Sequence, residues 1–492
     1  MTDLITSHHQ RSSVACDKPI VDIIGAGLAG SEAALQLASR GIAVRLFEMR
    51  PKYQTAVHKT GRCAELVCSN SLKSTKPDSA QGMLKHELTT LGSEVLACAY
   101  RNRVAAGGAL AVDRELFSGE VTHLIEDNSL IQRIDGEVVG LSENGAVLLT
   151  DMPGKAAMAV FPPADAVIVA SGPLTSDSLA QFMQKLTGTD HMAFYDAAAP
   201  VVMADSLDYD KVFSQSRYED EGTGDYYNAP FDKETYERFI NELVHAQRVI
   251  KRDFEGADLF QSCQPIEEIA RKGFDAPRFG PLKPVGLTDP TTGRRPWAVV
   301  QLRAEDVHKQ SFNLVGFQTN LTFPEQKRVF RMIPGLEEAE FARYGVMHRN
   351  TFINAPQLLN AQLRLTADGA RQLPVPVYVA GQFSGTEGYG EAIASGLWVA
   401  LNVAAQIKDV QLKALPTECA FGALLAYATN SETADYQPMH VNFGIMAPFD
   451  PPIRNKRQRY AAYAQRGAQA LEGYVAELRE LGLLAHCQNE EH

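Results

Sequence analysis

The chain has 492 residues and a formal net charge of −12, and 45% of its residues are hydrophobic and 22% charged. This length allows two or three domains, and this composition is typical of folded, soluble proteins, so wholesale disorder is excluded. The acidic balance argues against a surface covered throughout by nucleic acid but is compatible with a local basic patch. No apolar run reaches the roughly 20 residues that cross a bilayer, so no membrane association is expected.

The N-terminal segment 1–18 is polar and lacks the apolar stretch that a secretory signal requires. It predicts a disordered tail on a cytoplasmic protein. The cysteines lack the paired spacing of zinc sites, which predicts reduced thiols and no metal site. They are Cys16, Cys63, Cys68, Cys98, Cys263, Cys419 and Cys487.

The first predicted elements are a strand over Ile20–Ile24, a glycine turn, a helix that runs to Arg40 and a second strand over Ala43–Glu48. The turn reads G-x-G-x-x-G, and its place between a strand and a helix makes this dinucleotide-binding fingerprint specific. Glycines let the backbone approach a pyrophosphate, and the free N–H groups of the helix start stabilise its charge. A carboxylate at the end of the second strand is placed to bind a ribose. The predicted cofactor residues here are Gly25, Ala26, Gly27, Leu28, Ala29, Gly30 and Glu48.

Two later stretches indicate that the same domain returns. Buried-strand patterns over Ala166–Ala170 and Val375–Ala380 each lead into a glycine, and a glycine loop over 385–390 precedes a helix from about Glu391 to Gln406. This arrangement suits the remainder of a flavin, although an ordinary turn of a doubly wound sheet would show the same pattern. The cofactor residues predicted from these stretches are Gly172, Gly381, Gln382, Glu387 and Gly388.

The region from about residue 200 to 360 is richer in aromatic, proline and charged residues and carries no fingerprint, which predicts an inserted domain. The sequence has no second complete G-x-G-x-x-G, so a separate nicotinamide-binding domain is not expected. Near the C-terminus, apolar residues at helical spacing from Tyr460 to Leu481 predict an amphipathic helix. The predicted fold class is α/β, a Rossmann-type FAD-binding domain with an inserted α+β domain. The predicted boundaries are 1–18 for the tail, 19–199 and 363–492 for the two parts of the FAD-binding domain, and 200–362 for the insertion.

Two cysteines stand in polar surroundings that would favour a reactive thiolate. Cys68 follows a short apolar run and precedes small polar residues with Lys73 nearby, and Cys263 precedes a segment of acidic and basic residues. A small buried side chain without reactivity is the alternative for each of them.

Basic residues cluster in the inserted region and again between Arg454 and Arg459. Aromatic residues are interleaved with them, which would suit stacking on an unpaired base or a pterin ring. Solvated charges over core aromatic residues are the alternative, and we favour it on these residues alone. The charges concerned are Arg271, Lys272, Arg278, Lys283, Arg294, Arg295, Arg303, Arg328, Arg331, Arg343, His348 and Arg349, and the rings are Phe317, Phe330, Tyr344 and Phe352.

Several blocks of the sequence together resemble one family. They are GAGLAGSEAA, AELVCSNSLKS, AGGALAVDRELFS, FYDAAAPVV, FGPLKPVGLTDP, VVQLRAED, VGFQTNLTFPEQKRVFRMIPGLEEAEFARYGVMHRNTFINAP and GQFSGTEGYGEAIASGL. These ordered blocks lie within residues 19–445 and resemble the folate- and FAD-dependent tRNA (uracil-5-)-methyltransferases, the TrmFO family. The resemblance implies a GidA-like FAD-binding domain whose insertion contacts folate and tRNA.

The resemblance also implies a chemistry. It uses methylenetetrahydrofolate as carbon donor, reduced FAD as electron source, NADPH or NADH as reductant and a uridine of the tRNA T loop as acceptor. Because uracil C5 is a poor nucleophile, a thiolate must first add to C6. The match to the family's cysteine blocks implies Cys263 as this nucleophile and Cys68 as the thiol on the flavin side. Tyr389 is expected to cover the flavin ring, and His348 and Arg349 to contact folate or RNA. No obligatory protein partner is expected.

The sequence departs from the family at two positions and leaves alternatives open. Gln261 and Ser262 precede Cys263 where the family has Glu and Gly, which leaves the general base open, and Cys63 near Cys68 raises the alternative of an oxidisable pair. Competing interpretations are a GidA-type flavoprotein that modifies the wobble uridine of tRNA, a flavin oxidoreductase of small metabolites and a non-catalytic RNA-binding flavoprotein.

Overall fold

A computed structural model describes the chain as two bodies, each with its own hydrophobic core. The described residues are 18–55, 57–151, 157–189, 192–218, 224–250, 264–433 and 436–484, with the backbone alone at 192–196 and 348–349. The core of the larger body contains residues from Val21 to Met183 and from Phe352 to Leu483, and that of the smaller lobe contains residues from Ala199 to Ala339. The larger body is therefore built from two separate parts of the chain. The boundaries at 199/200 and 362/363 remain predictions.

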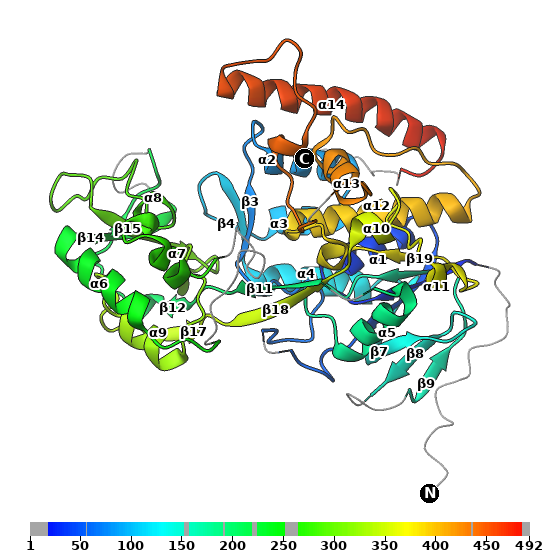
Figure 1. Cartoon of the computed structure of the whole chain (residues 1–492), viewed down its shortest axis with the longest axis horizontal. Helices are drawn as coiled ribbons and strands as arrows, with labels where there is room; N and C mark the ends of the chain where they lie inside the picture. The colour runs from blue at the N-terminus through cyan, green and yellow to red at the C-terminus, as the bar shows by residue number, and fades with distance from the viewer. Residues whose placement is uncertain are drawn as a thin grey trace, which may run out of the picture.

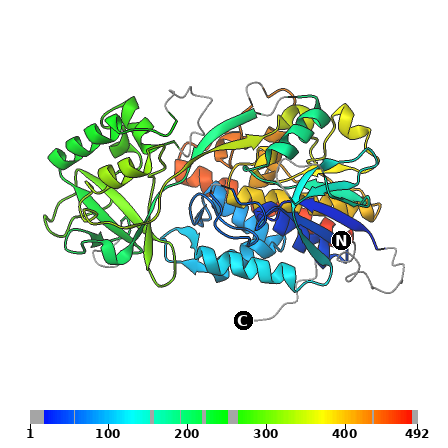
Figure 2. The ribbon, with the colours of Figure 1, turned by 90° about the horizontal axis from the view of Figure 1, so that it is seen from below.

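The two bodies lie side by side, and Figures 1 and 2 show a long two-stranded ribbon that joins them. The ribbon pairs β11 (Met192–Ala197) with β18 (Met347–Phe352) in antiparallel register. One strand enters the smaller lobe and the other leaves it, so the lobe is an insertion in the chain of the larger body.

The centre of the larger body is a parallel sheet with the strand order β19-β10-β1-β2-β6. Its strands are β1 (Ile20–Ile24), β2 (Ala43–Glu48), β6 (Ile131–Asp135), β10 (Ala166–Val169) and β19 (Val377–Val379). Because all of them run parallel, the loops that follow β1, β10 and β19 meet at one edge of the sheet. The strand β19 is shorter than the expected Val375–Ala380, since Pro376 has no N–H to donate to the ladder.

Glycines allow close packing at this edge of the sheet. A Cβ on Gly30 would lie 1.8 Å from the carbonyl oxygen of Gly25, and a Cβ on Gly396 would lie 2.2 Å from that of Ala29. Helix α1 (Leu28–Ser39) therefore packs directly along helix α12 (Tyr389–Ile407), backbone to backbone. The helix α12 begins before the expected Glu391 because Gly388, at φ 120°, turns the loop directly into it.

Two small antiparallel sheets and further helices complete the larger body. The sheets have the orders β3-β5-β4 and β7-β8-β9. Side chains of Ser79, Ser93, Asp113 and Ser176 accept backbone N–H bonds and so begin α2, α3, α4 and α5. The strands are β3 (Ser71–Ser74), β4 (Arg103–Val104), β5 (Ala109–Val112), β7 (Glu137–Leu141), β8 (Val147–Thr150) and β9 (Ala159–Phe161). The helices are α2 (Ala80–Thr90), α3 (Glu94–Arg101), α4 (Arg114–Glu126), α5 (Asp177–Thr187), α10 (Ala355–Leu358), α11 (Asp368–Arg371), η3 (Gly381–Ser384), α13 (Ala420–Ala428), η4 (Phe443–Ile445) and α14 (Lys456–Glu480).

The smaller lobe is an antiparallel sheet with helices, which confirms the predicted α/β fold with an inserted α+β domain. The sheet has the order β13-β14-β15-β16-β12-β17. Its strands are β12 (Val201–Met203), β13 (Phe213–Ser214), β14 (Tyr226–Phe231), β15 (Ala298–Ala304), β16 (Ser311–Leu314) and β17 (Phe341–Arg343). The helices are η1 (Ala204–Ser206), α6 (Lys233–His245), α7 (Ile266–Lys272), α8 (Ala276–Phe279) and α9 (Phe323–Phe330).

The C-terminal helix α14 lies along the larger body (Figure 1), next to α2. It buries Leu471, Tyr474, Val475 and Leu478, so the predicted amphipathic helix is confirmed. Nearby, the carboxylate of Glu87 accepts the N–H groups of Ala420 and Phe421 and thereby caps α13. None of the helices in the described part of the chain combines the length and apolar content needed to cross a bilayer.

Two glycine-to-alanine substitutions test the close packing of α1 on α12. Gly396→Ala forces a methyl group against the backbone of Ala29 and should lower the free energy of unfolding by about 1 to 3 kcal/mol. Gly473 lies in α14 where, among the described atoms, a Cβ meets nothing within 4 Å. Gly473→Ala is the matched control and should raise the same quantity by about 0.5 to 1 kcal/mol through helix propensity. Urea denaturation measures both, and equal stabilisation by the two changes would contradict the packing argument.

Candidate active site

A cavity opens at the edge of the sheet where β1, β10 and β19 end, with about 1000 Å³ of empty space, part of it open to solvent. Most of the predicted cofactor residues lie together on its wall. They are Gly25, Gly27, Leu28, Ala29, Glu48, Gly172, Gly381, Gln382 and Gly388, with Tyr389 beside them. The predicted residues Ala26, Gly30 and Glu387 are not part of the lining: Ala26 donates its N–H to Glu48, Gly30 packs against Gly25, and Glu387 accepts a hydrogen bond from Gln382.

The glycine turn between β1 and α1 leaves space for a ligand. Gly25 has φ +103°, and a Cβ there would lie 2.5 Å from the carbonyl oxygen of Ala170, so this position needs glycine. A Cβ on Gly27 would instead meet nothing within 4 Å among the described atoms. Gly27 precedes the first turn of α1, whose N–H groups and dipole favour a phosphate. The turn thus has the open backbone approach that a pyrophosphate requires.

Glu48, at the end of β2, is a buried carboxylate held by several donors. It accepts the N–H of Ala26 at 2.8 Å and the Nε–H of Arg50 at 2.9 Å. Burial by itself would raise the pKa of Glu48, but the hydrogen bonds and charge of Arg50 outweigh it and leave the pKa below its ordinary value. Glu48 is therefore ionised and able to accept hydrogen bonds from ribose hydroxyls.

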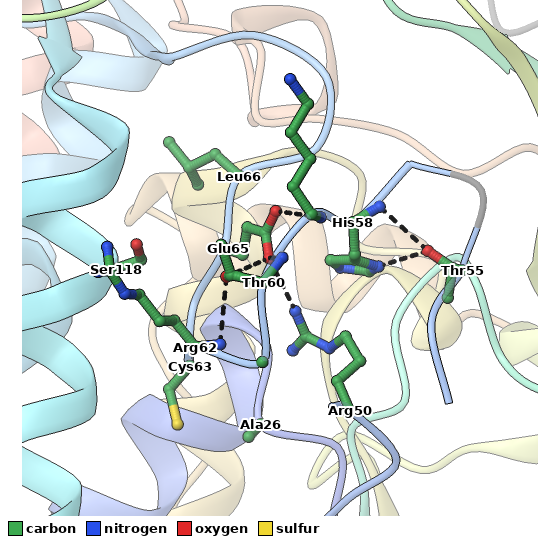
Figure 3. Close-up of polar contacts among 12 residues, drawn as sticks. Ala26, Arg50, Thr55, His58, Thr60, Arg62, Cys63, Glu65, Leu66 and Ser118 are labelled. Atoms are coloured by element: carbon green, nitrogen blue, oxygen red, sulfur yellow. Dashed lines mark hydrogen bonds and ion pairs between the residues drawn. The ribbon is translucent and has the colours of Figure 1, made fainter. Parts of the chain in front are cut away.

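Glu65 organises the loop that separates this cavity from a second one. Figure 3 shows its carboxylate beside Thr60 and Arg50. It accepts the N–H of Lys59 at 2.8 Å, the hydroxyl of Thr60 at 2.7 Å and a guanidinium N–H of Arg50 at 3.3 Å. Glu65 lines both cavities, so the loop around it is a shared wall.

Cys68 follows this wall in the sequence but lines neither cavity, and its backbone contacts Tyr389. The backbone N–H groups of Cys68 and Ser69 donate to the Tyr389 hydroxyl at 2.9 and 3.3 Å. The Cys68 thiol is partly exposed and reaches the carbonyl oxygen of Ala197, at 3.7 Å. Burial, and next the charge of Cys68, raise the pKa of Tyr389. The phenol therefore keeps its proton and can donate it toward a ligand in the first cavity.

The second cavity, with about 1450 Å³ of empty space, lies between the two bodies. Its wall includes Arg114 from α4, Glu305 just after β15 and Arg343 from β17. Arg114 forms an ion pair with Glu305 and donates to the carbonyl oxygens of Leu66 at 2.6 Å and Cys68 at 3.2 Å. We did not expect this group from the sequence, because Arg114 and Glu305 are 191 positions apart.

A second contact between the bodies involves Asn70, in the block that contains Cys68. The Asn70 amide donates to the carbonyl oxygens of Val112 and Ala304, and its side-chain oxygen accepts from Arg303. All of these groups are buried, so the hydrogen bonds join β15 of the lobe rigidly to the larger body.

Some predicted site residues lie where the structure gives no side chain. Cys263 belongs to residues 251–263, outside the described residues. His348 and Arg349 lie on β18, opposite Asp196 and Tyr195 of β11, and only their backbone is described. Their assignments stay predictions.

Most of the basic and aromatic residues of the lobe have structural roles. Phe317 and Phe330 are fully buried and Phe352 nearly so, which confirms the core alternative for these rings and makes stacking on a base wrong for them. Arg278 lies over the ring of Trp297 at 3.5 Å, and Arg328 forms ion pairs with Glu242 and Glu325.

Cys63 is a free, fully buried thiol. Burial raises its pKa to about 11, which disfavours the thiolate. Cys68 is free as well, and the alternative of an oxidisable pair stays a prediction. Within the described ranges, no group of three or more His, Cys, Asp or Glu side chains could hold a metal ion.

Comparisons with known proteins agree with this architecture. The family model of glucose inhibited division protein A (GidA) matches residues 20–411. Two solved crystal forms of GidA from Aquifex aeolicus superpose on this chain with TM-scores of 0.70 and 0.68 and sequence identities of 17% and 16%. Each superposition covers 96% of this chain, and they cover 77% and 75% of the GidA chains. At that identity the similarity concerns the fold alone.

Curated relatives are closer in sequence. A protein from Desulforudis audaxviator is 47% identical to this chain, in an alignment that covers 94% of this chain and 99% of the relative. A protein from Heliobacterium modesticaldum is 48% identical, in an alignment that covers 93% of this chain and 98% of the relative. A third, from Geobacter sulfurreducens, is 48% identical over 93% of this chain and 99% of its own length. All three are named methylenetetrahydrofolate–tRNA-(uracil-5-)-methyltransferase TrmFO. The chain belongs to the GidA family and, within it, to the TrmFO group.

Proposed function

We propose that this protein methylates C5 of the T-loop uridine of tRNA, with methylenetetrahydrofolate as carbon donor and reduced FAD as electron source. The observation that carries the proposal is the contact between Cys68 and Tyr389 at the edge of the glycine-turn cavity. It fixes the backbone of Cys68 to Tyr389, which lines the cavity that suits a flavin dinucleotide. Relatives about 47% identical over most of the chain are named for this reaction.

The residues of the first cavity fit FAD. The open position of Gly27 suits the pyrophosphate, and the ionised carboxylate of Glu48 suits the ribose next to adenine. Gly381, Gln382 and the start of α12 line the cavity near Tyr389, where the isoalloxazine end would lie. When bound, FAD supplies the electrons that convert the transferred carbon into a methyl group.

The chain's own groups also act at uracil. A thiolate adds to C6 across the C5=C6 double bond and makes C5 nucleophilic, and we assign this role to Cys263. After C5 has taken up the carbon, a base removes the C5 proton and the thiolate leaves C6, which restores the double bond. We assign Cys68 to the flavin side, where its backbone is fixed from one side by Tyr389 and from the other by Arg114. The protonated phenol of Tyr389 donates a hydrogen bond into the cavity and excludes water from it.

The remaining assignments complete the proposal. His348 and Arg349 contact folate or RNA. NADPH or NADH reduces the flavin, and we expect no separate domain in this chain that binds the nicotinamide nucleotide. The reaction takes place in the cytoplasm, where tRNA and reduced folates are available.

One assay tests the function. The protein is incubated with unmodified tRNA, methylenetetrahydrofolate and NADPH or NADH, and the nucleosides are analysed after digestion. We expect 5-methyluridine that depends on the folate. Modification confined to the wobble uridine would support the GidA-type alternative, and flavin turnover without any change in the tRNA would support a small-molecule oxidoreductase.

Cysteine substitutions test the assigned thiols. Cys263→Ala and Cys68→Ala should each abolish 5-methyluridine formation while bound flavin remains, because each removes one thiol. Cys98→Ala is the matched control, since Cys98 is buried and burial holds its thiol protonated at neutral pH. Undiminished methylation by the Cys263 variant would remove that residue from the mechanism.

Gly27→Val tests the position of the pyrophosphate. The new side chain projects into open space, so the protein should fold but purify without flavin absorbance. Circular dichroism and thermal unfolding check the fold, and the visible spectrum reports the cofactor. A folded variant that keeps one flavin per chain would show that the pyrophosphate binds elsewhere.

A further inference from the structure

The segment 441–471, which includes the first half of α14, is strongly basic. It contains five cations, and Asp450 is its single carboxylate. The chain as a whole has a net charge of −12, so the segment differs in sign from the rest of the protein. The five cations are Arg454, Lys456, Arg457, Arg459 and Arg466.

These cations are not neutralised within the fold. Among the described residues, none of the five forms an ion pair with a carboxylate. Two of them are bound to the backbone: Arg459 donates to the carbonyl oxygen of Ile453 at 3.1 Å, and Arg466 to that of Ala447 at 2.8 Å. The other three are exposed and are available to a ligand. They are Arg454, Lys456 and Arg457.

Aromatic rings hold this basic cluster in place. Lys456 and Arg459 lie over the ring of Tyr460, at 5.4 and 5.8 Å from its centre. Tyr460 packs in turn on Phe443, with the two ring centres 4.3 Å apart. Contacts between cations and rings orient charged side chains, so less conformational entropy is lost when a ligand binds. The charges are therefore presented from an ordered surface.

The place of these charges in the helix is unfavourable for the fold. The first turn of α14 contains Lys456 and Arg457 and no acidic residue. The N-terminal end of a helix carries a partial positive charge, so cations there destabilise the helix. Like charges three positions apart on a helix, such as Lys456 and Arg459, also repel each other. A cluster that costs stability in this way indicates a role in binding an anion.

The neighbouring elements do not cancel this charge. Helix α2 packs against α14, and residues 75–90 contribute two cations and two carboxylates, which balance. Glu418 adjoins α14 at Gly467, which is roughly 16 Å along the helix from Lys456. The charged residues of 75–90 are Lys76, Asp78, Lys85 and Glu87, with His86 beside them.

A long ligand can reach both the basic cluster and Cys68. A groove between α14 and the turn after β3 is lined by Ala464, Thr75 and Pro77. Cys68 and Thr75 are at most roughly 25 Å apart, since seven extended residues span no more. Roughly 12 Å of helix separates Ala464 from Lys456. Figure 1 shows the start of α14 on the side of the larger body that faces the smaller lobe.

The surface suits a nucleic acid better than a membrane. None of the large hydrophobic residues in 441–471 is exposed, so the surface offers no apolar side chains for insertion into a bilayer. Exposed lysine and arginine side chains bind the phosphates of a nucleic acid without reading its sequence. An RNA a few tens of ångströms long also matches the separation between the cluster and Cys68.

We propose that the start of α14 is a second contact surface for tRNA, where Arg454, Lys456 and Arg457 bind backbone phosphates outside the T loop. The inference rests on the proposed function, which names the RNA. It adds the surface that holds the body of the tRNA while the target uridine is at the thiols.

The test is the salt dependence of binding to unmodified full-length tRNA, measured with the flavin-containing protein by fluorescence anisotropy. The triple variant Arg454→Gln, Lys456→Gln and Arg457→Gln should reduce the slope of log Kd against log salt by roughly 2 to 3, as three lost phosphate contacts imply. Its affinity at low salt should fall about tenfold or more. The KM for tRNA should rise while kcat stays unchanged, because the contact holds substrate and transition state equally.

A second triple variant is the matched control. It carries Lys408→Gln, Lys413→Gln and Arg479→Gln, which remove three exposed cations at the other end of α14. This variant should bind tRNA as the unaltered protein does. Thermal unfolding checks for a structural role of the cluster. Loss of its cations should leave the Tm unchanged or raise it, because they lie at the positive end of the helix.

An unaltered salt slope in the first triple variant would overturn the inference. So would an equal loss in both triple variants, because the effect would then follow net charge alone. The inference also fails if the first triple variant keeps its tRNA affinity but loses binding to phosphatidylserine vesicles that the unaltered protein binds. If that triple variant does not fold, Arg457→Gln decides, with an expected loss of slope of roughly 0.7 to 0.9.

The proposed function is judged by a different result. Unaltered protein that binds tRNA with the expected salt slope but forms no 5-methyluridine would reject the proposed function alone. Unaltered protein that does not bind tRNA would overturn both.

Discussion

The close backbone approach of α1 to the sheet and to α12 is the constraint on which the site depends. Gly30 packs on Gly25 and Gly396 packs on Ala29, at distances that no side chain would permit. This packing holds the start of α1 and the start of α12 at the same edge of the parallel sheet. The glycine turn and Tyr389 therefore lie on one cavity although they are more than three hundred residues apart in the sequence.

A second set of contacts positions the lobe against that edge. Asn70 is hydrogen-bonded to β15, and Arg114 pairs with Glu305 just after the same strand. Buried ion pairs contribute little net stability, but loss of one partner costs about 3 to 5 kcal/mol because the other charge stays buried. Such contacts specify one arrangement of the two bodies, and the second cavity exists only in that arrangement.

The two cavities share a wall but differ in their lining. Glu48 and the helix start of α1 give the first cavity a carboxylate for ribose and N–H groups for phosphate, whereas the second has charged side chains of both signs from both bodies. Cys68 lines neither cavity, but its backbone connects their walls: its N–H donates to Tyr389 of the first, and its carbonyl oxygen accepts from Arg114 and Arg343 of the second.

The amino-acid sequence alone was sufficient for the local features. The fingerprint at Gly25–Gly30, the returning strands and the amphipathic α14 follow from spacing and periodicity over a few residues, and the inserted lobe follows from the composition of residues 200–360. The structure has all of them. The resemblance in ordered blocks also led to the correct family.

The tertiary structure alone decided the rest. The grouping of Arg114, Glu305 and Arg343 joins α4, the turn after β15 and β17, and no local pattern encodes which distant charges will meet. Likewise, the sequence could not tell whether Phe317 packs in the core or stacks on a ligand, because both interpretations predict the same aromatic and charged residues. The burial of the ring in the folded chain decided for the core. Contacts between distant segments depend on how whole elements pack, and this is the physical reason why they were visible only in the folded chain.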